Sequence, residues 1–211
     1  MRIKELKPGF EQLTKEKARL IGHLIGDGCV FQSKTDYNIK YEVTDPELLQ
    51  QFERDLVSVY GLPPTKGVNP SGKTGRLIPL IRLRSKRAFE DLKRYCEFGS
   101  AVWRVPTEIR VADPAIQTEF LRALFDDEGS VVPQGKYFQV RLYSINRNGL
   151  LQIQELLSAF FISSKLVPGY GAKRNVYGLR INERLRFSAL IGFSLKRKQQ
   201  KLERLLMVQN R

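Results

Sequence analysis

Hydrophobic and polar positions along the chain predict the same order of elements twice. Apolar residues that recur every three or four positions indicate helices, and strict alternation indicates strands. In the first half this predicts a helix ending in LIGHLIGDG (20–28), a strand at 37–44, a helix at 46–61, a strand at 77–84 and a helix at 85–95. The second half repeats the order with LRALFDDEG (121–129), 137–144, 148–161, 176–182 and 183–193. If a short strand follows each motif, both halves have the order αββαββα.

The repeat predicts how the chain is divided. Its period of about 100 residues indicates two similar halves in one chain. We place the N-terminal half at residues 1–105 and the C-terminal half, which ends in a basic helix, at residues 106–211. The predicted fold class is α+β with two pseudo-symmetric halves. Two similar halves suggest a pseudo-twofold axis, a symmetry that duplex DNA shares.

The two motifs share a small residue in third place, an acid in eighth place and a final glycine. Gly22 and Ala123 would let two helices approach closely. Asp27 and Glu128 would then lie side by side where the two helices end. Carboxylates are unfavourable at helix C-termini, so a cation should offset them, and Mg²⁺ prefers such oxygen ligands. The alternative is that GDG only forms a turn, but an acid at the same place in both halves favours a site.

The charge of the chain points to a polyanionic partner. There are 36 Lys and Arg against 22 Asp and Glu, a formal net charge of +14 and a pI near 9.9, which favours nucleic acid. No apolar run of about 18 residues is present, so we expect no membrane partner. The N-terminus lacks a signal peptide pattern and the ends lack an intein splice-junction pattern. We expect a free-standing cytoplasmic, nucleoid-associated protein, or an organellar one if the host is eukaryotic.

Few residues of the chain suit metal clusters or disulfides. Cys29 and Cys96 are its two cysteines and His23 is its single histidine. These counts exclude a disulfide framework, a zinc finger and nuclease sites built on several histidines. We expect His23 to be a packed helix residue.

Residues 67–74, GVNPSGKT, match the phosphate-binding pattern G-x-x-x-x-G-K-[ST]. That pattern needs a strand before it and a helix after it, so that the phosphate meets a helix N-terminus. Here a strand pattern follows. We interpret 67–74 and the equivalent 168–175 as basic loops that connect strands, which disfavours a nucleotide hydrolase using Lys73.

Both motifs resemble those of the LAGLIDADG homing endonucleases, specifically the single-chain type with two motifs. The first motif matches the family consensus at Leu20, Gly22, Asp27 and Gly28, and the second keeps an acid in eighth place between Leu121 and Gly129. The resemblance extends from about residue 15 to 205. It implies a saddle of antiparallel sheets on a two-helix interface.

The resemblance also implies roles for residues of the motifs. Asp27 and Glu128 correspond to the metal-binding catalytic acids, one for each DNA strand. The backbone carbonyls of Gly26 and Asp127 correspond to further metal ligands. The implied cofactor is Mg²⁺, with two or more divalent ions bound and Mn²⁺ as a substitute.

Basic and polar residues of the implied catalytic pocket are assigned on looser matches. The segment 193–202 makes Lys196 the candidate lysine of the second half, and 98–106 makes Arg104 the candidate of the first half. The family's polar residue after the hairpin falls near Asp45 and Ile145. Ile145 is apolar, so it does not fit that role.

The predicted strands and loops supply residues for DNA recognition. Alternation leaves one face of each strand outward, and polar side chains there suit base edges in the major groove. The outward strand residues are Asn38, Lys40, Glu42, Thr44, Arg82, Arg84, Tyr137, Gln139, Arg141, Tyr143, Arg180 and Asn182. The loop residues expected at phosphates are Lys34, Lys73, Arg76, Lys136, Lys173 and Arg174. Strands of about 9 residues in both halves would cover roughly 18 base pairs of double-stranded DNA.

The activity that the resemblance implies is site-specific cleavage of DNA. The product would be a double-strand break with short 3′ overhangs. The two halves differ at most outward positions, so we expect an asymmetric target and a monomeric protein. The alternative is a protein of the same fold without cleavage, either an RNA maturase or a DNA-binding regulator.

Overall fold

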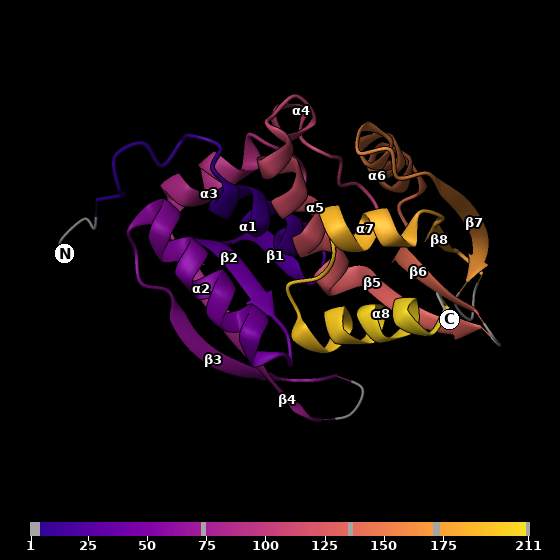
Figure 1. The fold of residues 1–211 in the computed structure, drawn as a ribbon. Coiled ribbons are helices and arrows are strands. Elements are labelled where there is room, and N and C mark those ends of the chain that lie inside the picture. Colours follow the sequence, from indigo (N-terminus) through magenta and orange to yellow (C-terminus); the bar gives the residue numbers. More distant parts are fainter. Residues whose placement is uncertain (1–4, 73–74, 135–136, 171–173, 210–211) are drawn as a thin grey trace.

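The structure is a computed structural model that describes residues 5–72, 75–134, 137–170 and 174–209 (Figure 1). It contains two four-stranded antiparallel sheets, one in each half. The strand orders are β1-β2-β4-β3 and β5-β6-β8-β7, which are the same topology. The predicted α+β class with two pseudo-symmetric halves is confirmed.

The first half runs through three helices and four strands. These are α1 (Lys15–Ile25), β1 (Gly28–Ser33), β2 (Asp36–Glu42), α2 (Pro46–Tyr60), β3 (Thr65–Pro70), β4 (Leu77–Arg84) and α3 (Lys86–Lys93). A short helix, α4 (Thr107–Arg110), leads into the second half. Its elements are α5 (Pro114–Glu128), β5 (Gly129–Gln134), β6 (Tyr137–Ser144), α6 (Arg147–Ala159), β7 (Ser164–Tyr170), β8 (Val176–Ile181), α7 (Arg184–Leu190) and α8 (Lys196–Gln209).

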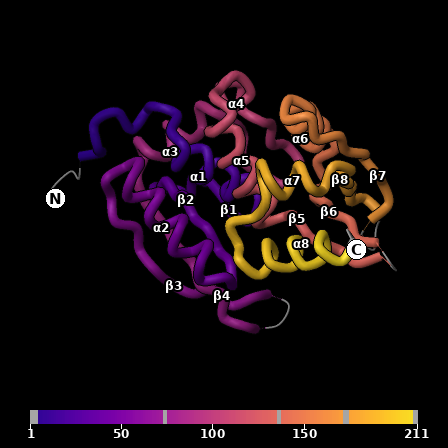
Figure 2. The backbone as a smooth tube through the Cα atoms, in the orientation of Figure 1, coloured from indigo at the N-terminus to yellow at the C-terminus, as the bar shows by residue number. Residues whose placement is uncertain are grey.

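Helices α1 and α5 pack against each other at the centre, and we call this contact the seam (Figures 1 and 2). A Cβ atom added at Gly22 would lie 2.7 Å from the carbonyl oxygen of Phe120 and 2.8 Å from the Cβ of Ala123. The predicted close approach through small residues is therefore present. Leu20, Leu121 and many other apolar residues are fully buried around it, so one core spans both halves.

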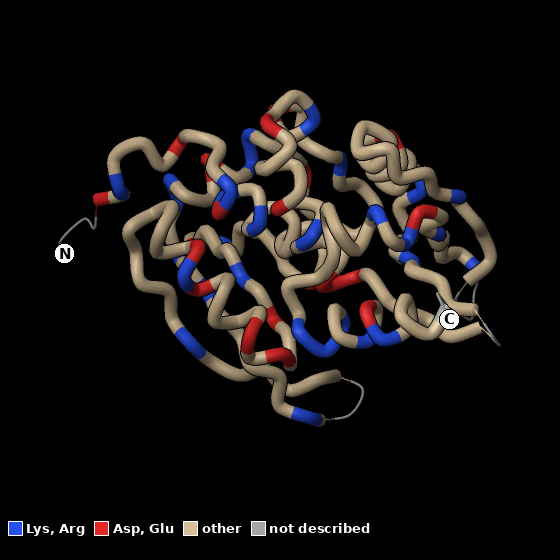
Figure 3. The backbone as a smooth tube through the Cα atoms, viewed as in Figure 1, with Lys and Arg blue, Asp and Glu red and all other residues tan. Residues whose placement is uncertain are grey.

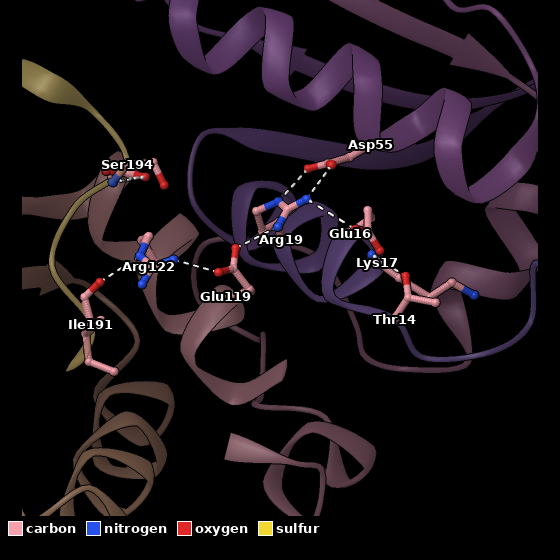
Figure 4. A network of polar contacts seen from close by, with 10 residues as sticks. Thr14, Glu16, Lys17, Arg19, Asp55, Glu119, Arg122, Ile191 and Ser194 are labelled. Atoms are coloured by element: carbon pink, nitrogen blue, oxygen red, sulfur yellow. Dashed lines mark hydrogen bonds and ion pairs between the residues drawn. The ribbon is translucent and has the colours of Figure 1, made fainter. Parts of the chain in front are cut away.

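Ion pairs extend the seam away from the motif ends (Figure 4). The guanidinium of Arg19 donates two hydrogen bonds to Asp55 of α2, at 2.9 and 2.7 Å, and one to Glu119 of α5 at 2.7 Å. Arg122 donates to Glu119 at 2.6 Å and to the carbonyl of Ile191 at 2.7 Å. This chain of contacts ties α2, α1 and α5 to the loop before α8.

Two sequence-based predictions about strands are wrong. Residues 67–70 are part of the edge strand β3 rather than a loop, and residues 168–170 belong to β7. Glycine and proline are tolerated on such edge strands because one side of the strand needs no ladder hydrogen bonds. The strand expected at 37–44 ends at Glu42, and Thr44 lies in the turn before α2.

The stretch GVNPSGKT does not have the surroundings of a phosphate-binding loop. Its first residues lie in β3, and the next element is the strand β4 instead of a helix. Lys73 itself lies outside the described residues, as do Lys136 and Lys173. Among the helices described here, none is long and apolar enough to cross a membrane.

Candidate active site and nucleic-acid interface

The two motif acids lie at the C-terminal ends of the seam helices. Helix α1 ends at Ile25 with Gly26 as its cap, and Asp27 follows just before β1. Helix α5 ends at Glu128, and β5 begins at the next residue. Figure 3 shows the acidic end of α5 at the centre of the molecule, close to the basic start of α8.

The surroundings of both acids disfavour their negative charge. Desolvation by the surrounding protein and the charge of Asp127 together raise the pKa of Asp27 to about 6, although the side chain still meets solvent. Desolvation raises the pKa of Glu128 to about 7, with added repulsion from Asp27 and Asp127. Carboxylates crowded together in this way are stabilised by a bound cation.

A third acid, Asp127, is fully buried directly beneath these two. Its carboxylate accepts a hydrogen bond from the hydroxyl of Tyr41 at 2.5 Å and lies 3.1 Å from Nδ1 of His23. The expectation that His23 packs inside is confirmed, since its exposed fraction is 1%. Burial alone would lower the pKa of His23, but the charge of Asp127 and its hydrogen bond, together with the charges of Asp126 and Asp55, outweigh burial and the pKa is raised.

The lysine that lies beside the acids is Lys198, whereas Lys196, the choice made from the sequence, lies away from them, and its catalytic role stays a prediction. Lys198 Nζ donates to the backbone carbonyls of Gly129 at 2.6 Å and of Asp127 at 3.4 Å, and also to that of Asp126. Burial lowers its pKa, and its charge lowers the pKa of both Asp27 and Glu128. Lys196 is exposed and points toward Glu47, 3.8 Å away.

Helix α8 is held in place by acids from both halves. The carboxylate of Asp126 accepts hydrogen bonds from the amides of Ser194 and Leu195, both at 3.1 Å, just before the helix. Asp45 accepts two hydrogen bonds from Arg197, at 3.1 and 2.8 Å. These contacts fix the rotation of α8 that turns Lys198 toward the end of α5.

The equivalent place in the first half has no such lysine among the described residues. A cavity of about 220 Å³ lies there, lined by Gly26, Glu128, Ser100, Trp103 and Ile145, among others. Arg104 is exposed and is not part of this lining. Its predicted catalytic role stays a prediction, and Ile145 supplies no polar group to the cavity.

The outward face of the second sheet carries a connected set of polar side chains. Arg141 and Arg180 are register partners on β6 and β8. Arg141 donates to Gln139 at 2.7 Å and to the hydroxyl of Tyr143 at 3.1 Å, while Arg180 donates to Tyr170 at 2.8 Å. Tyr170 was not predicted for this face, because its stretch was interpreted as a loop.

The outward face of the first sheet differs from expectation at one position. Asn38 is only 3% exposed, so the prediction that it is open to DNA is wrong. Its register partners Phe31 and Arg84 flank it, and its amide donates to Ser33 and to the carbonyl of Asp36, which closes the hairpin turn. Arg82 does lie outward, and its Nε is buried without a hydrogen-bond partner among the described residues.

Some of the other residues predicted to contact DNA are exposed, and some are paired with neighbouring side chains. Lys40 and Glu42 form an ion pair with each other at 2.6 Å. Lys34 and Arg174 are exposed at positive φ angles in their turns, and Arg76 is exposed beside the described end of its loop. Tyr137 is 70% exposed, and Asn182 donates to Ser163 at 3.0 Å.

Comparisons with known proteins agree with this geometry. A family model described as a LAGLIDADG-like domain matches residues 115–192. The homing endonuclease I-DmoI in complex with DNA and Ca is similar over 90% of this chain and 97% of its own, with 18% identity and a TM-score of 0.65. Residues 115–192 thus match a LAGLIDADG-like domain, and the chain shares the fold of these homing endonucleases.

The chain is also similar to proteins of other kinds. I-WcaI bound to its DNA recognition sequence matches 93% of this chain and 96% of its own, at 16% identity and a TM-score of 0.64. Full-length DUF199/WhiA from Thermatoga maritima matches 95% of this chain and 61% of its own, at 16% identity and a TM-score of 0.61. The replicative DNA helicase DnaB of Nostoc sp. strain PCC 7120 is 27% identical over 194 residues, which are 82% of this chain and 21% of that protein. The chain thus spans about a fifth of the length of that curated relative.

The donor set at the LAGLIDADG motif ends fits a hard divalent cation. Asp27 and Glu128 offer carboxylate oxygens at one place, and burial together with the neighbouring carboxylates raises their pKa values, an effect that a bound cation would offset. The described residues contain no group of three or more His, Cys, Asp or Glu that would enclose a metal. Mg²⁺ does not require one, since it keeps several waters and binds through one or two carboxylates together with phosphate.

Proposed function

We propose that this LAGLIDADG protein is a metal-dependent, site-specific DNA endonuclease. The observation that carries the proposal is the pair of acids, Asp27 and Glu128, at adjacent ends of the two seam helices with raised pKa values. A protein that only binds DNA gains nothing from carboxylates placed where phosphates approach. Similar proteins, I-DmoI and I-WcaI, have been seen with DNA, and I-DmoI also in the presence of Mg, Mn or Ca.

In this proposal the motif residues hold divalent ions between the two sheets. The carboxylates of Asp27 and Glu128 bind them, with the backbone carbonyls of Gly26 and Asp127 as additional ligands. When bound, such ions lower the pKa of water and neutralise charge on a phosphate. Two acids, one from each half, suit cleavage of two strands and a break with short 3′ overhangs.

Lys198 supplies the fixed positive charge of the site. Its ammonium is held by the carbonyls at the end of α5 and lies close enough to both acids to lower their pKa values. A buried, preorganised cation of this kind stabilises charge that develops on a phosphate during hydrolysis. The site in the first half lacks an equivalent lysine in the described residues, so the two strands meet different surroundings.

The sheets would recognise the DNA. Their outward side chains differ between the halves, with Lys40, Glu42 and Arg82 on one and Gln139, Arg141 and Arg180 on the other. An asymmetric site of roughly 18 base pairs is the length expected for strands of about 9 residues in both halves, and the outward strands of 6–8 residues would have to be supplemented by their loops to cover it. One chain supplies both halves, so the active form would be a monomer.

The test is cleavage of a randomised duplex library in Mg²⁺, with sequencing of the fragment ends. The parent should give staggered ends at one long asymmetric sequence, while Asp27→Asn and Glu128→Gln should bind that sequence without cutting it. Lys198→Met should slow cleavage by about 10²–10³-fold, the usual effect of removing one stabilising group. Lys201→Met, on the exposed side of the same helix, is the matched control and should cut normally.

Other results would point elsewhere. A parent that binds DNA but never cuts would favour a regulator, and tight binding of structured RNA without DNA cleavage would favour a maturase. If Lys196→Met lost the rate and Lys198→Met did not, the sequence-based choice of lysine would stand and the one made from the structure would fall.

A further inference from the structure

The side chain of Asp127 is buried at the seam, although the resemblance assigns a role only to its backbone carbonyl. Its exposed fraction is 0%. It belongs to α5 of the second half, yet its contacts are with the first half, namely Tyr41 on β2, His23 on α1 and the backbone amide of Asp27. A buried carboxylate is costly unless it is well paired, so this arrangement requires an explanation.

The carboxylate touches the turn that carries Asp27. The amide of Asp27 lies 3.4 Å from Oδ2 of Asp127. A Cβ atom added at Gly26 would lie 2.6 Å from the same oxygen, so the carboxylate and the backbone of Gly26 are in direct contact. Movement of Asp127 would therefore displace both Gly26 and Asp27.

The two groups that hold Asp127 are themselves fixed by packing. The ring of Tyr41 stacks on Phe52, with ring centroids 4.7 Å apart, and the ring of His23 lies 5.0 Å from that of Tyr41. His23 and Tyr41 are 1% and 0% exposed. Aromatic rings packed on several sides keep one orientation, so they offer Asp127 fixed hydrogen-bonding groups.

The described part of the second half has no equivalent arrangement. By position in the motif, His23 corresponds to Leu124, and by pairing with the strand after the motif, Tyr41 corresponds to Leu142. Both leucines are buried and apolar. Gly26 occupies the place that corresponds to Asp127. The polar group formed by His23, Tyr41 and Asp127 thus occurs where Asp127 of the second motif meets Gly26 of the first.

We propose that Asp127, held by Tyr41 and His23, is a positioning residue that presets the backbone of Gly26 and Asp27 for a divalent cation. The inference rests on the proposed function, because it assigns a task at the same metal site. Residues that orient metal ligands typically change metal affinity or activity 10–100-fold when they are mutated. Tyr41→Phe removes one hydrogen bond while it keeps the ring, and His23→Leu installs the residue of the second motif.

The test is Mn²⁺ binding to the full chain without DNA, followed by the EPR signal of free Mn²⁺. Tyr41→Phe and His23→Leu should each weaken Mn²⁺ binding by about tenfold or more. Tyr60→Phe is the matched control, since Tyr60 is another buried tyrosine that donates to a buried aspartate, Asp91, at 2.9 Å. It should lose comparable stability in urea and keep the Mn²⁺ affinity of the parent.

Cleavage assays add a readout that stability alone would not change. In Tyr41→Phe the Mn²⁺ concentration that gives half of the maximal cleavage rate should rise about tenfold. The cleavage rate at saturating Mn²⁺ should be within about twofold of that of the parent, because no group that touches the phosphate has changed. If Tyr41→Phe bound Mn²⁺ as Tyr60→Phe does, while Asp27→Asn abolished binding, the positioning role would be refuted and the endonuclease proposal would stand. A parent that neither bound Mn²⁺ nor cut DNA would overturn both.

Discussion

Single residues at the motif ends show what sequence reasoning reached and what it missed. Asp27 and Glu128 were predicted to meet because each occupies the same place in a repeated motif, and the structure does bring their helix ends together. Lys198 was missed because lysines at nearby positions of one helix point in different directions, and the sequence does not say which of them faces the acids. At about 100° per residue, positions 196 and 198 lie roughly 200° apart, and only the contacts of α8 decide which one faces the acids.

The raised pKa values of the two acids lead to a prediction about stability without metal. The folded protein holds protons on Asp27 and Glu128 up to about pH 6 and 7, whereas an unfolded chain releases them near their ordinary values. The stabilisation from these protons is therefore full below the ordinary pKa values of 3.8 and 4.5, decreases as the pH rises, and is lost once the pH has passed about 6 to 7.

Asp27→Asn should consequently stabilise the metal-free protein at pH 8 and stabilise it by clearly less at pH 5. We expect a rise in Tm of about 2–4 °C at pH 8, which corresponds to about 1 kcal/mol in a chain of this size. Thermal unfolding in EDTA at both pH values measures it. Asp113→Asn, at the exposed start of α5, is the control. An equal gain at both pH values would contradict the assigned cause.

At the scale of elements, helices and central strands were predicted well and edge strands were not. The predicted bounds of β4 and β6 agree with the structure, because β6 alternates between buried and half-buried residues and β4 is a continuous run rich in Leu and Ile that is bounded by turn residues. The edge strands β3 and β7 contain Gly67, Pro70 and Gly169, residues that signal turns in a sequence. Their strand conformation comes from pairing with β4 and β8, which no local pattern reveals.

The seam between α1 and α5 yields a prediction about Gly22. Alanine favours a helix by about 1 kcal/mol over glycine, but its methyl group would lie 2.7 Å from the carbonyl oxygen of Phe120. Pushing the helices apart should outweigh the gain, so Gly22→Ala should lower the free energy of unfolding by about 1–3 kcal/mol. Urea denaturation measures this.

The control for Gly22→Ala is Gly72→Ala, because nothing lies within 4 Å of a Cβ atom at Gly72. This control should change stability little. A stabilised Gly22→Ala variant would mean that the two helices are not in close contact in solution.

At the scale of the whole molecule, the net charge of +14 and the two outward sheet faces predict two separable kinds of DNA contact. Contacts with phosphates depend steeply on salt, and contacts with bases carry sequence preference. Lys34, in an exposed turn, represents the first kind. Gln139, within the polar set on β6, represents the second.

We expect Lys34→Gln to weaken binding to all DNA sequences and to reduce the slope of log K against log salt by about 1. Gln139→Ala should leave that slope unchanged and relax the preference at one or two base positions. Fluorescence anisotropy at several salt concentrations measures the first effect, and selection from a randomised library measures the second. Reversed outcomes would show that the two side chains have been assigned to the wrong class.

The arrangement of the two sheets has a consequence for how such a protein changes over time. Every described strand pairs within its own sheet, and the halves are joined through helices. The distance between the two acids is therefore set by α1, α5 and the side chains that pack on them, and is independent of which side chains lie on the outward face of either sheet. If the outward side chains of one sheet recognise one half of a DNA target, they can change by mutation or be exchanged with those of a relative. The distance between Asp27 and Glu128 would not change.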